Sequence, residues 1–175
     1  MMAERMFRFF LYLSFTLLGL WIMKQGTFLH RYILGQENNP QYFQNYPCQQ
    51  LPRYLDDYYL IKLSYHVFEL LNASLFHRDR RDFSEFLLHH ILTIVLVSYS
   101  YCTNVIPIGG SVMMIMDASD ALVAVFKLTV DVYEKFQLPT FLIMLAGWIY
   151  FRLWFFPIYQ IKEIWVQGQA TGHPS

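Results

Sequence analysis

Long apolar stretches alternate with short polar connections along most of the chain. Residues 9–23, 91–116 and 136–151 contain no charged side chain. A helix needs about 20 predominantly apolar residues to cross a bilayer, so stretches of this length predict transmembrane helices. The pattern therefore predicts an all-α fold, a polytopic transmembrane helical bundle of about five spans. These spans lie at about residues 6–23, 57–76, 83–101, 108–130 and 139–161.

The connections between the predicted spans indicate how the bundle is oriented. Residues 24–56 contain scattered proline, asparagine and glutamine without periodicity, which is typical of a loop. Residues 77–82 read HRDRRD, and a short arginine-rich connection is expected to face the cytosol. The N-terminus and residues 131–135 then lie on the cytosolic side. The long loop and the segment after residue 162 lie on the far side.

Composition also favours a membrane protein. The chain is 55% hydrophobic and only 15% charged, whereas an average soluble domain is about 25% charged. No basic face with interleaved aromatic residues is present, so no nucleic-acid partner is expected. Cys48 and Cys102 fit no metal-binding or redox spacing.

Polar side chains inside the predicted spans recur at the spacing of a helical face. In the second span this face holds Tyr58, Lys62, Tyr65, Glu69 and Asn72. In the fourth span it holds Asp117, Asp120, Ala124, Lys127 and Asp131. The third span contributes Glu85, His89 and Thr93, and the fifth contributes Arg152. Because polar groups in lipid must face protein or a water-filled cavity, we expect these faces to surround one polar cavity.

Two interpretations of these polar residues differ in what they predict. Side chains that only hydrogen-bond neighbouring helices would hold the bundle together, and this is preferred for Tyr65, Asn72, Thr93 and Ser100. Ionisable groups at membrane depth cost about 2.5–3.5 kcal/mol each, which favours a functional role for them. That second interpretation is preferred for His89, His90, Asp117 and Asp120. Both stay open for Lys62 and Glu69, since these side chains can simply pair.

The histidines favour acyl transfer over the alternatives. Only His66, His89 and His90 of the six histidines fall at membrane depth, and no HxxxH or HxxHH box occurs. Adjacent helical residues point about 100° apart, so no metal site is predicted. The chain has no GxSxG motif, which disfavours a serine hydrolase. A neutral imidazole can act as a general base or accept an acyl group, and Glu85, one turn before His89, can fix its tautomer.

Residues 80–120, RRDFSEFLLHHILTIVLVSYSYCTNVIPIGGSVMMIMDASD, resemble the Lag motif of the ceramide synthases in the TLC-domain superfamily. The family pattern contains R-K/R-D-F-x-E-x-x-x-H-H, later H-D-x-S-D, and then a lysine. The matching residues are Arg80, Arg81, Asp82, Phe83, Glu85, His89, His90, Thr93, Leu96, Ser100, Tyr101, Asn104, Ile108, Gly109, Asp117, Ser119, Asp120 and Lys127. Outside the motif, YYLIKLSYH and FRLWFFPIY resemble further family segments.

The resemblance implies a single TLC-type transmembrane domain over residues 1–175 and a multi-pass enzyme of the endoplasmic reticulum membrane. Such an enzyme joins the acyl group of a fatty acyl-CoA to the amine of a sphingoid base, forming ceramide or dihydroceramide. No cofactor is expected, because fatty acyl-CoA is the co-substrate. Membrane lipids are further partners, and a homodimer or heterodimer stays open.

The resemblance also implies roles for individual residues. The expected catalytic residues are His89, His90, Asp117 and Asp120, with a histidine carrying a transient acyl group as one option. The expected substrate-binding residues are Arg80, Arg81, Glu85, Lys127 and Arg152. Among these, the arginines of the basic connection and Lys127 are expected near the phosphates of CoA.

Two features depart from the family pattern. The H-D of the pattern reads Met116-Asp117 here. The family also continues through one more span after the segment that FRLWFFPIY resembles, so we expect either a truncated form lacking a final sixth span or a divergent member. The alternative function is therefore a non-enzymatic TLC-domain protein that binds or senses lipid and keeps the polar cavity without turnover.

Overall fold

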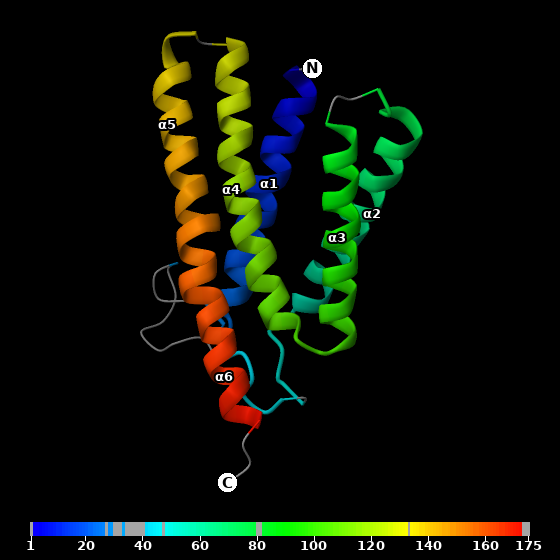
Figure 1. The fold of residues 1–175 in the computed structure, drawn as a ribbon, viewed down its shortest axis with the longest axis vertical. Helices are drawn as coiled ribbons and strands as arrows, with labels where there is room; N and C mark the ends of the chain where they lie inside the picture. Colours follow the sequence, from blue (N-terminus) through cyan, green and yellow to red (C-terminus); the bar gives the residue numbers. More distant parts are fainter. Residues whose placement is uncertain are drawn as a thin grey trace.

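Figure 1 shows the computed structural model of the chain, in which long helices run side by side. The structure describes residues 2–26, 28–29, 33, 41–46, 48–79, 82–132 and 134–172. These residues contain helices and no strand, which confirms the all-α fold expected from the sequence.

Within the described residues, five long helical stretches follow one another. The first four are α1 (Met2–Lys24), α2 (Leu55–Phe76), α3 (Phe83–Cys102) and α4 (Ile106–Val132). The fifth joins α5 (Gln137–Trp148), the π-helical segment η3 (Ile149–Ile161) and α6 (Lys162–Gly172) without a break. A short 3₁₀ turn, η2 (Glu134–Phe136), precedes it. Four of the predicted spans start and end within a few residues of these helices, and the fifth stretch runs beyond residue 161.

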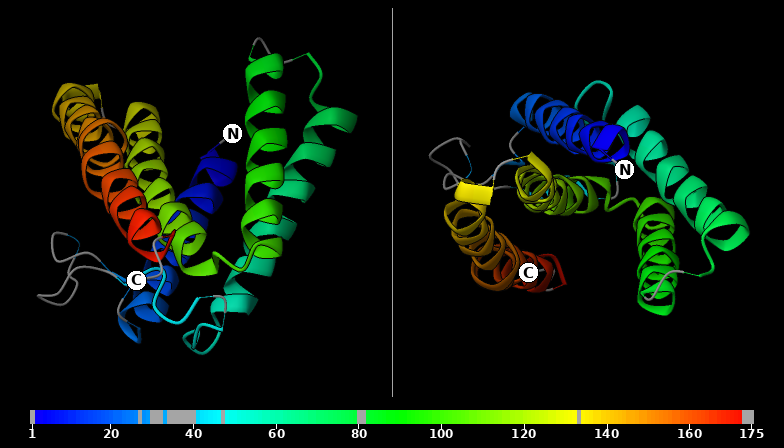
Figure 2. Two further views of the ribbon diagram at one scale, coloured as in Figure 1. Left: turned by 60° about the horizontal axis from the view of Figure 1, so that its bottom comes forward. Right: turned by 90° about the horizontal axis from the view of Figure 1, so that it is seen from above.

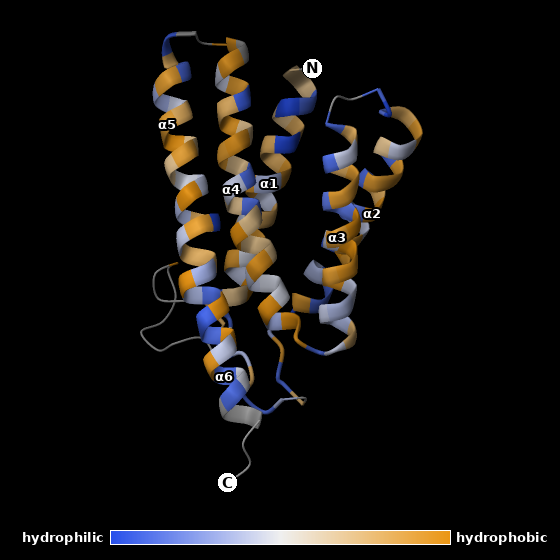
Figure 3. Ribbon diagram, viewed as in Figure 1, coloured by the Kyte–Doolittle hydropathy of each residue, from blue (hydrophilic) through white to orange (hydrophobic). Residues whose placement is uncertain are grey.

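Four of the stretches are long and apolar enough to cross a membrane: Met2–Lys24, Phe83–Cys102, Ile106–Val130 and Gln137–Gln169. Apolar residues extend along most of their length, and polar residues gather near the two ends of the bundle (Figure 3). The remaining helix, α2, also has 22 residues, but it carries Lys62 and Glu69 within its length. Both side chains are buried against other helices, so the charged face of α2 is directed toward protein.

The core lies where α1, α2 and α4 meet. Ile22, Met23, Tyr58, Tyr59 and Met114 are each at most 2% exposed. The contact between α2 and α4 depends on a glycine, because a Cβ atom at Gly109 would overlap the hydroxyl oxygen of Tyr59. Close packing of small and aromatic residues thus brings the polar face of α2 against α4.

The connections between helices lie alternately at the two ends of the molecule, as expected for an antiparallel bundle. The N-terminus and the α2–α3 and α4–α5 connections lie at one end of the molecule, and the C-terminus lies at the other (Figure 1). The sequence predicts this same grouping. Figure 2 shows α2 and α3 as a hairpin that diverges from α1 and α4 toward the end holding the N-terminus.

Candidate active site

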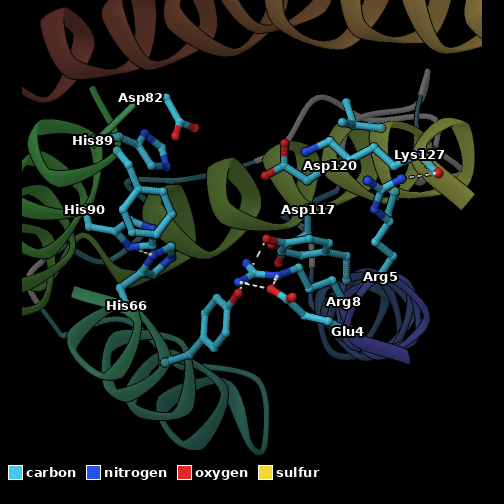
Figure 4. Close-up of a pocket in the computed structure, with 15 residues that line it drawn as sticks. Glu4, Arg5, Arg8, His66, Asp82, His89, His90, Asp117, Asp120 and Lys127 are labelled. Carbon is cyan, nitrogen blue, oxygen red and sulfur yellow. Dashed lines mark hydrogen bonds and ion pairs between the residues drawn. The ribbon is translucent and has the colours of Figure 1, made fainter. Parts of the chain in front are cut away.

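A cavity of about 670 Å³ lies between the α2–α3 hairpin and the pair formed by α1 and α4. Its lining includes five of the residues expected to be catalytic or to bind substrate: His89, His90, Asp117, Asp120 and Lys127. Figure 4 shows the histidines on one side of the cavity and the two aspartates on the other. The expected polar cavity between helices is therefore present, and it contains all four residues expected to be catalytic.

The two adjacent histidines have different surroundings. His90 is 6% exposed, and its Nδ1 lies 3.3 Å from Nδ1 of His66 on α2. The Phe86 ring lies against it, with 4.3 Å between the ring centroids. His89 is exposed where it lines the cavity. The divergence of neighbouring side chains on a helix thus places one imidazole within reach of a ligand and the other between two helices.

Asp117 is part of a buried ion pair. Its Oδ1 accepts a hydrogen bond from Lys62 Nζ at 2.6 Å, and the hydroxyl of Tyr58 lies 3.5 Å from Oδ2. The side chains of Lys62 and Asp117 are 2% and 5% exposed. The ammonium group also lies 4.6 Å from the centroid of the Phe15 ring. This pair joins α2 to α4 through Oδ1, and Tyr58 is the group near Oδ2.

Asp120 is more accessible and binds a different helix. Its Oδ1 accepts a hydrogen bond from an Arg152 amino group at 2.6 Å, while Arg152 Nε donates to Ser119 Oγ at 2.9 Å. Arg152 therefore links η3 to α4. Among the described residues, Asp120 Oδ2 accepts no hydrogen bond, which leaves one carboxylate oxygen for a group inside the cavity.

The remaining predicted residues lie in several places. Glu85 is exposed, outside the cavity lining, and within the described part of the chain no hydrogen bond joins it to His89. The expected orientation of His89 by Glu85 is therefore not observed. Arg80 and Arg81 lie outside the described residues. Lys127 is exposed at the cavity, where its backbone oxygen accepts a hydrogen bond from Arg5 at 2.9 Å.

The two charged residues left open on α2 each pair with another helix. Lys62 binds Asp117, and Glu69 Oε2 lies 3.2 Å from an Arg8 amino group. Arg8 also binds Glu4, one turn earlier on α1. No role is predicted for these α1 residues from the sequence, although Glu4 and Arg8 are spaced for one helical face. Charges at the start of a first span are also typical of a cytosolic flank, so their spacing alone does not indicate a site.

His66 also lines the cavity, and the sequence alone predicts no role for it. It follows Lys62 by four residues, so it lies on the same face of α2. That spacing could have indicated that His66 faces the cavity. Its pairing with His90 depends on how α2 and α3 pack against each other, which local spacing does not report.

Imidazole groups lie on one side of the cavity and a carboxylate lies on the other. Arginine and lysine side chains also line this cavity. A neutral imidazole can transfer a proton or attack a carbonyl, and a carboxylate can hold an ammonium group. Among the described residues, no group of three or more histidine, cysteine or acidic side chains is arranged to hold a metal ion.

Comparisons with known proteins agree on one family. The family model described as the TLC domain matches residues 1–174. Ceramide synthase 4 of Bos taurus is 36% identical over 116 residues, which are 66% of this chain and 29% of that protein. Sphingosine N-acyltransferase lag1 of Schizosaccharomyces pombe is 30% identical over 155 residues, 88% of this chain and 38% of that protein.

A third relative matches almost the whole chain. Ceramide synthase hyl-1 of Caenorhabditis elegans is 28% identical over 174 residues, 98% of this chain and 45% of that protein. The chain therefore spans less than half the length of these three relatives. No solved structure matches it.

Proposed function

The chain belongs to the TLC-domain family, and we propose that it joins the acyl group of a fatty acyl-CoA to the amine of a sphingoid base. The product would be ceramide or dihydroceramide, formed in the endoplasmic reticulum membrane. The names of the relatives, ceramide synthase and sphingosine N-acyltransferase, support this reaction class. The observation that carries the proposal is the cavity in which an accessible His89 lies across from the open carboxylate oxygen of Asp120.

In the proposed reaction His89 is the residue that contacts the thioester. One imidazole nitrogen attacks the thioester carbonyl, the carbon–sulfur bond breaks, and CoA leaves as the thiol with the proton given up by the other imidazole nitrogen. The ammonium group gives up one proton to the Asp120 carboxylate, the resulting neutral amine attacks the acyl carbon to form the amide, and the imidazole leaves with the second amine proton. General-base removal of the amine proton by His89 is the alternative role within the same geometry. His90 lies next to His89 on the buried side of α3 and would hold the His89 ring in position.

We propose that Asp120 holds and orients the amine of the sphingoid base, because its Oδ2 is open within the described residues. Arg152 would position this carboxylate rather than bind substrate directly, since it already donates to Asp120 and Ser119. Asp117 would act through the Lys62 ion pair by holding the cavity wall in place.

The CoA phosphates would bind at the end of the bundle that holds the N-terminus. Arg5 and Lys127 line the cavity there, and the connection containing Arg80 and Arg81 is predicted on the same side. Glu85 lies in the first turn of α3, at that same end. No cofactor is required by this scheme, because the acyl donor is already activated as a thioester.

A specific observation favours a second candidate function, the binding or sensing of lipid without turnover. Met116 occupies the place of a histidine in the ceramide synthase pattern, and the adjacent Asp117 is neutralised by Lys62. A cavity with these two features can hold an amphipathic lipid without completing acyl transfer.

The decisive experiment is an assay of ceramide formation by the purified full chain with a fatty acyl-CoA and sphinganine. We expect the wild type to form ceramide, measured by mass spectrometry. His89→Ala should lower the rate by at least about 100-fold, because a positioned proton-transfer group typically contributes that much. His90→Ala should also remove most of the activity, because the His89 ring loses its neighbour on the buried side. His77→Ala provides a matched control, since His77 lies outside the cavity lining at the end of α2.

Two results would contradict the proposal. Activity near wild type in both cavity-histidine variants would remove their catalytic role. A folded wild type that binds sphinganine or acyl-CoA but forms no ceramide would instead support the lipid-binding alternative.

A further inference from the structure

We infer that His66, on α2, is a positioning residue that constrains the orientation and tautomer of His90. The inferred effect on catalysis rests on the proposed acyl transfer, whereas the contact between the two rings does not depend on it. His66 lines the cavity, and its Nδ1 lies 3.3 Å from Nδ1 of His90. The two ring centroids are 5.3 Å apart.

The chemistry of this contact restricts both rings. A hydrogen bond between two imidazole Nδ1 atoms needs a hydrogen on one and a lone pair on the other. With both rings neutral, His90 carries its hydrogen on Nε2 if His66 donates, and has a lone pair on Nε2 if His90 itself donates. The hydrogen bond can persist when one of the two rings is doubly protonated. It is lost when both are, because neither Nδ1 then has a lone pair. The identity of residue 66 therefore influences which nitrogen of His90 can accept a proton.

His66 is well placed for this role because its helix is anchored. Four residues earlier on α2, Lys62 forms the 2.6 Å ion pair with Asp117 on α4. The neighbouring Tyr65 ring lies with its centroid 5.5 Å from that of His66. Contacts thus run from α4 through α2 to His90.

His90 in turn lies next to the exposed histidine. The centroids of the His89 and His90 rings are 5.3 Å apart, and Phe86 lies against His90 at 4.3 Å. With Phe86 and His66 both against its ring, His90 has little rotational freedom. We therefore expect a change at His66 to alter the reactivity of the histidine pair without touching a substrate.

The plain alternative is that His66 only holds α2 and α3 together. The chain offers a matched control for this reading, because Tyr59 on α2 donates a hydrogen bond to Ser100 Oγ on α3 at 2.7 Å. Neither Tyr59 nor Ser100 is among the residues that line the cavity. Tyr59→Phe therefore removes a hydrogen bond between the same two helices outside the site.

The kinetic test compares three variants of the full chain in detergent. His66→Phe keeps a ring and removes the hydrogen bond, and His66→Asn places an amide near the position of Nδ1. We expect His66→Phe to lower kcat by about tenfold or more, about 1.4 kcal/mol in the barrier, with both KM values little changed. His66→Asn should recover most of kcat, and Tyr59→Phe should affect thermal unfolding but not kcat.

A spectroscopic test separates this inference from the proposed function. Imidazole ¹⁵N shifts distinguish the two neutral tautomers, and the His90 signals can be identified by their loss in His90→Gln. We expect His66→Phe to change the ¹⁵N shifts of His90, and Tyr59→Phe to leave them as in the wild type. This measurement applies even if the wild type forms no ceramide, so failure of the proposed function is detected separately.

Either of two outcomes would overturn the inference. One is a His90 spectrum that is the same in wild type and in His66→Phe. The other is a kcat for folded His66→Phe within about twofold of wild type, in an enzyme whose His90→Ala variant is inactive.

Discussion

Asp117 and Asp120 lie three residues apart on α4 and line the same cavity, yet their surroundings differ. The Asp117 side chain is 5% exposed and pairs with Lys62, whose side chain is 2% exposed. The Asp120 side chain is 35% exposed and pairs with Arg152, whose side chain is 25% exposed. Both ion pairs have the same 2.6 Å separation, so distance alone does not distinguish them.

The difference in exposure separates two roles. Removing one partner from a buried ion pair leaves an uncompensated charge, which typically costs about 3–5 kcal/mol. A pair that remains partly exposed contributes much less to stability, because water can replace either partner. The comparison indicates that Asp117 mainly holds α2 to α4, while Asp120 remains available to a bound molecule.

Loss of the buried ion pair between Lys62 and Asp117 should destabilise the protein strongly. Lys62→Met leaves the Asp117 carboxylate buried and unpaired, so we expect a loss of about 3–5 kcal/mol in the free energy of unfolding. The measurement is the yield and thermal unfolding of detergent-solubilised protein. The double variant Lys62→Met with Asp117→Leu removes both charges and should recover most of the folded protein. Normal thermal unfolding of the single variant would show that Asp117 does not depend on Lys62.

A smaller but more specific effect is expected at the exposed pair. Asp120→Asn keeps the shape of the side chain and removes its charge, so the amine of the proposed substrate loses its counter-ion. We expect turnover to fall by at least about tenfold, roughly 1.4 kcal/mol in the barrier, with little change in folded yield. Ceramide formation per mole of folded protein is the quantity to measure. Full activity in this variant would place Asp120 with Asp117 as a residue that only joins helices.

The smallest expected effect concerns the second oxygen of Asp117. The Tyr58 hydroxyl lies 3.5 Å from Oδ2, a long separation for a hydrogen bond between oxygens. Tyr58→Phe should therefore lower stability by no more than about 1 kcal/mol and leave turnover unchanged. Thermal unfolding and the ceramide assay both test this. A large loss of stability would show that Tyr58, rather than Lys62, supplies the main support for Asp117.

Much of the fold and the candidate site could be predicted from local patterns. Long apolar stretches predict helices, and steps of three and four place Asp117, Asp120 and Lys127 on one face of α4. The same reasoning directed His89 toward the interior, and all of these residues line the cavity. Helical spacing did not identify the partner of Glu69, which is Arg8 on another helix.

Which faces of the helices are polar follows from the order of residues alone, because a helical face is set by spacing within one segment. Which polar groups meet follows from the packing of the helices. Lys62 and Asp117 are separated by 55 residues along the chain, Asp120 and Arg152 by 32, and His66 and His90 by 24. Those pairings depend on how α2, α3, α4 and η3 pack together, at contacts such as Gly109 against Tyr59. As a result of packing, Asp117 is buried and paired with Lys62, whereas Asp120 remains open to the cavity.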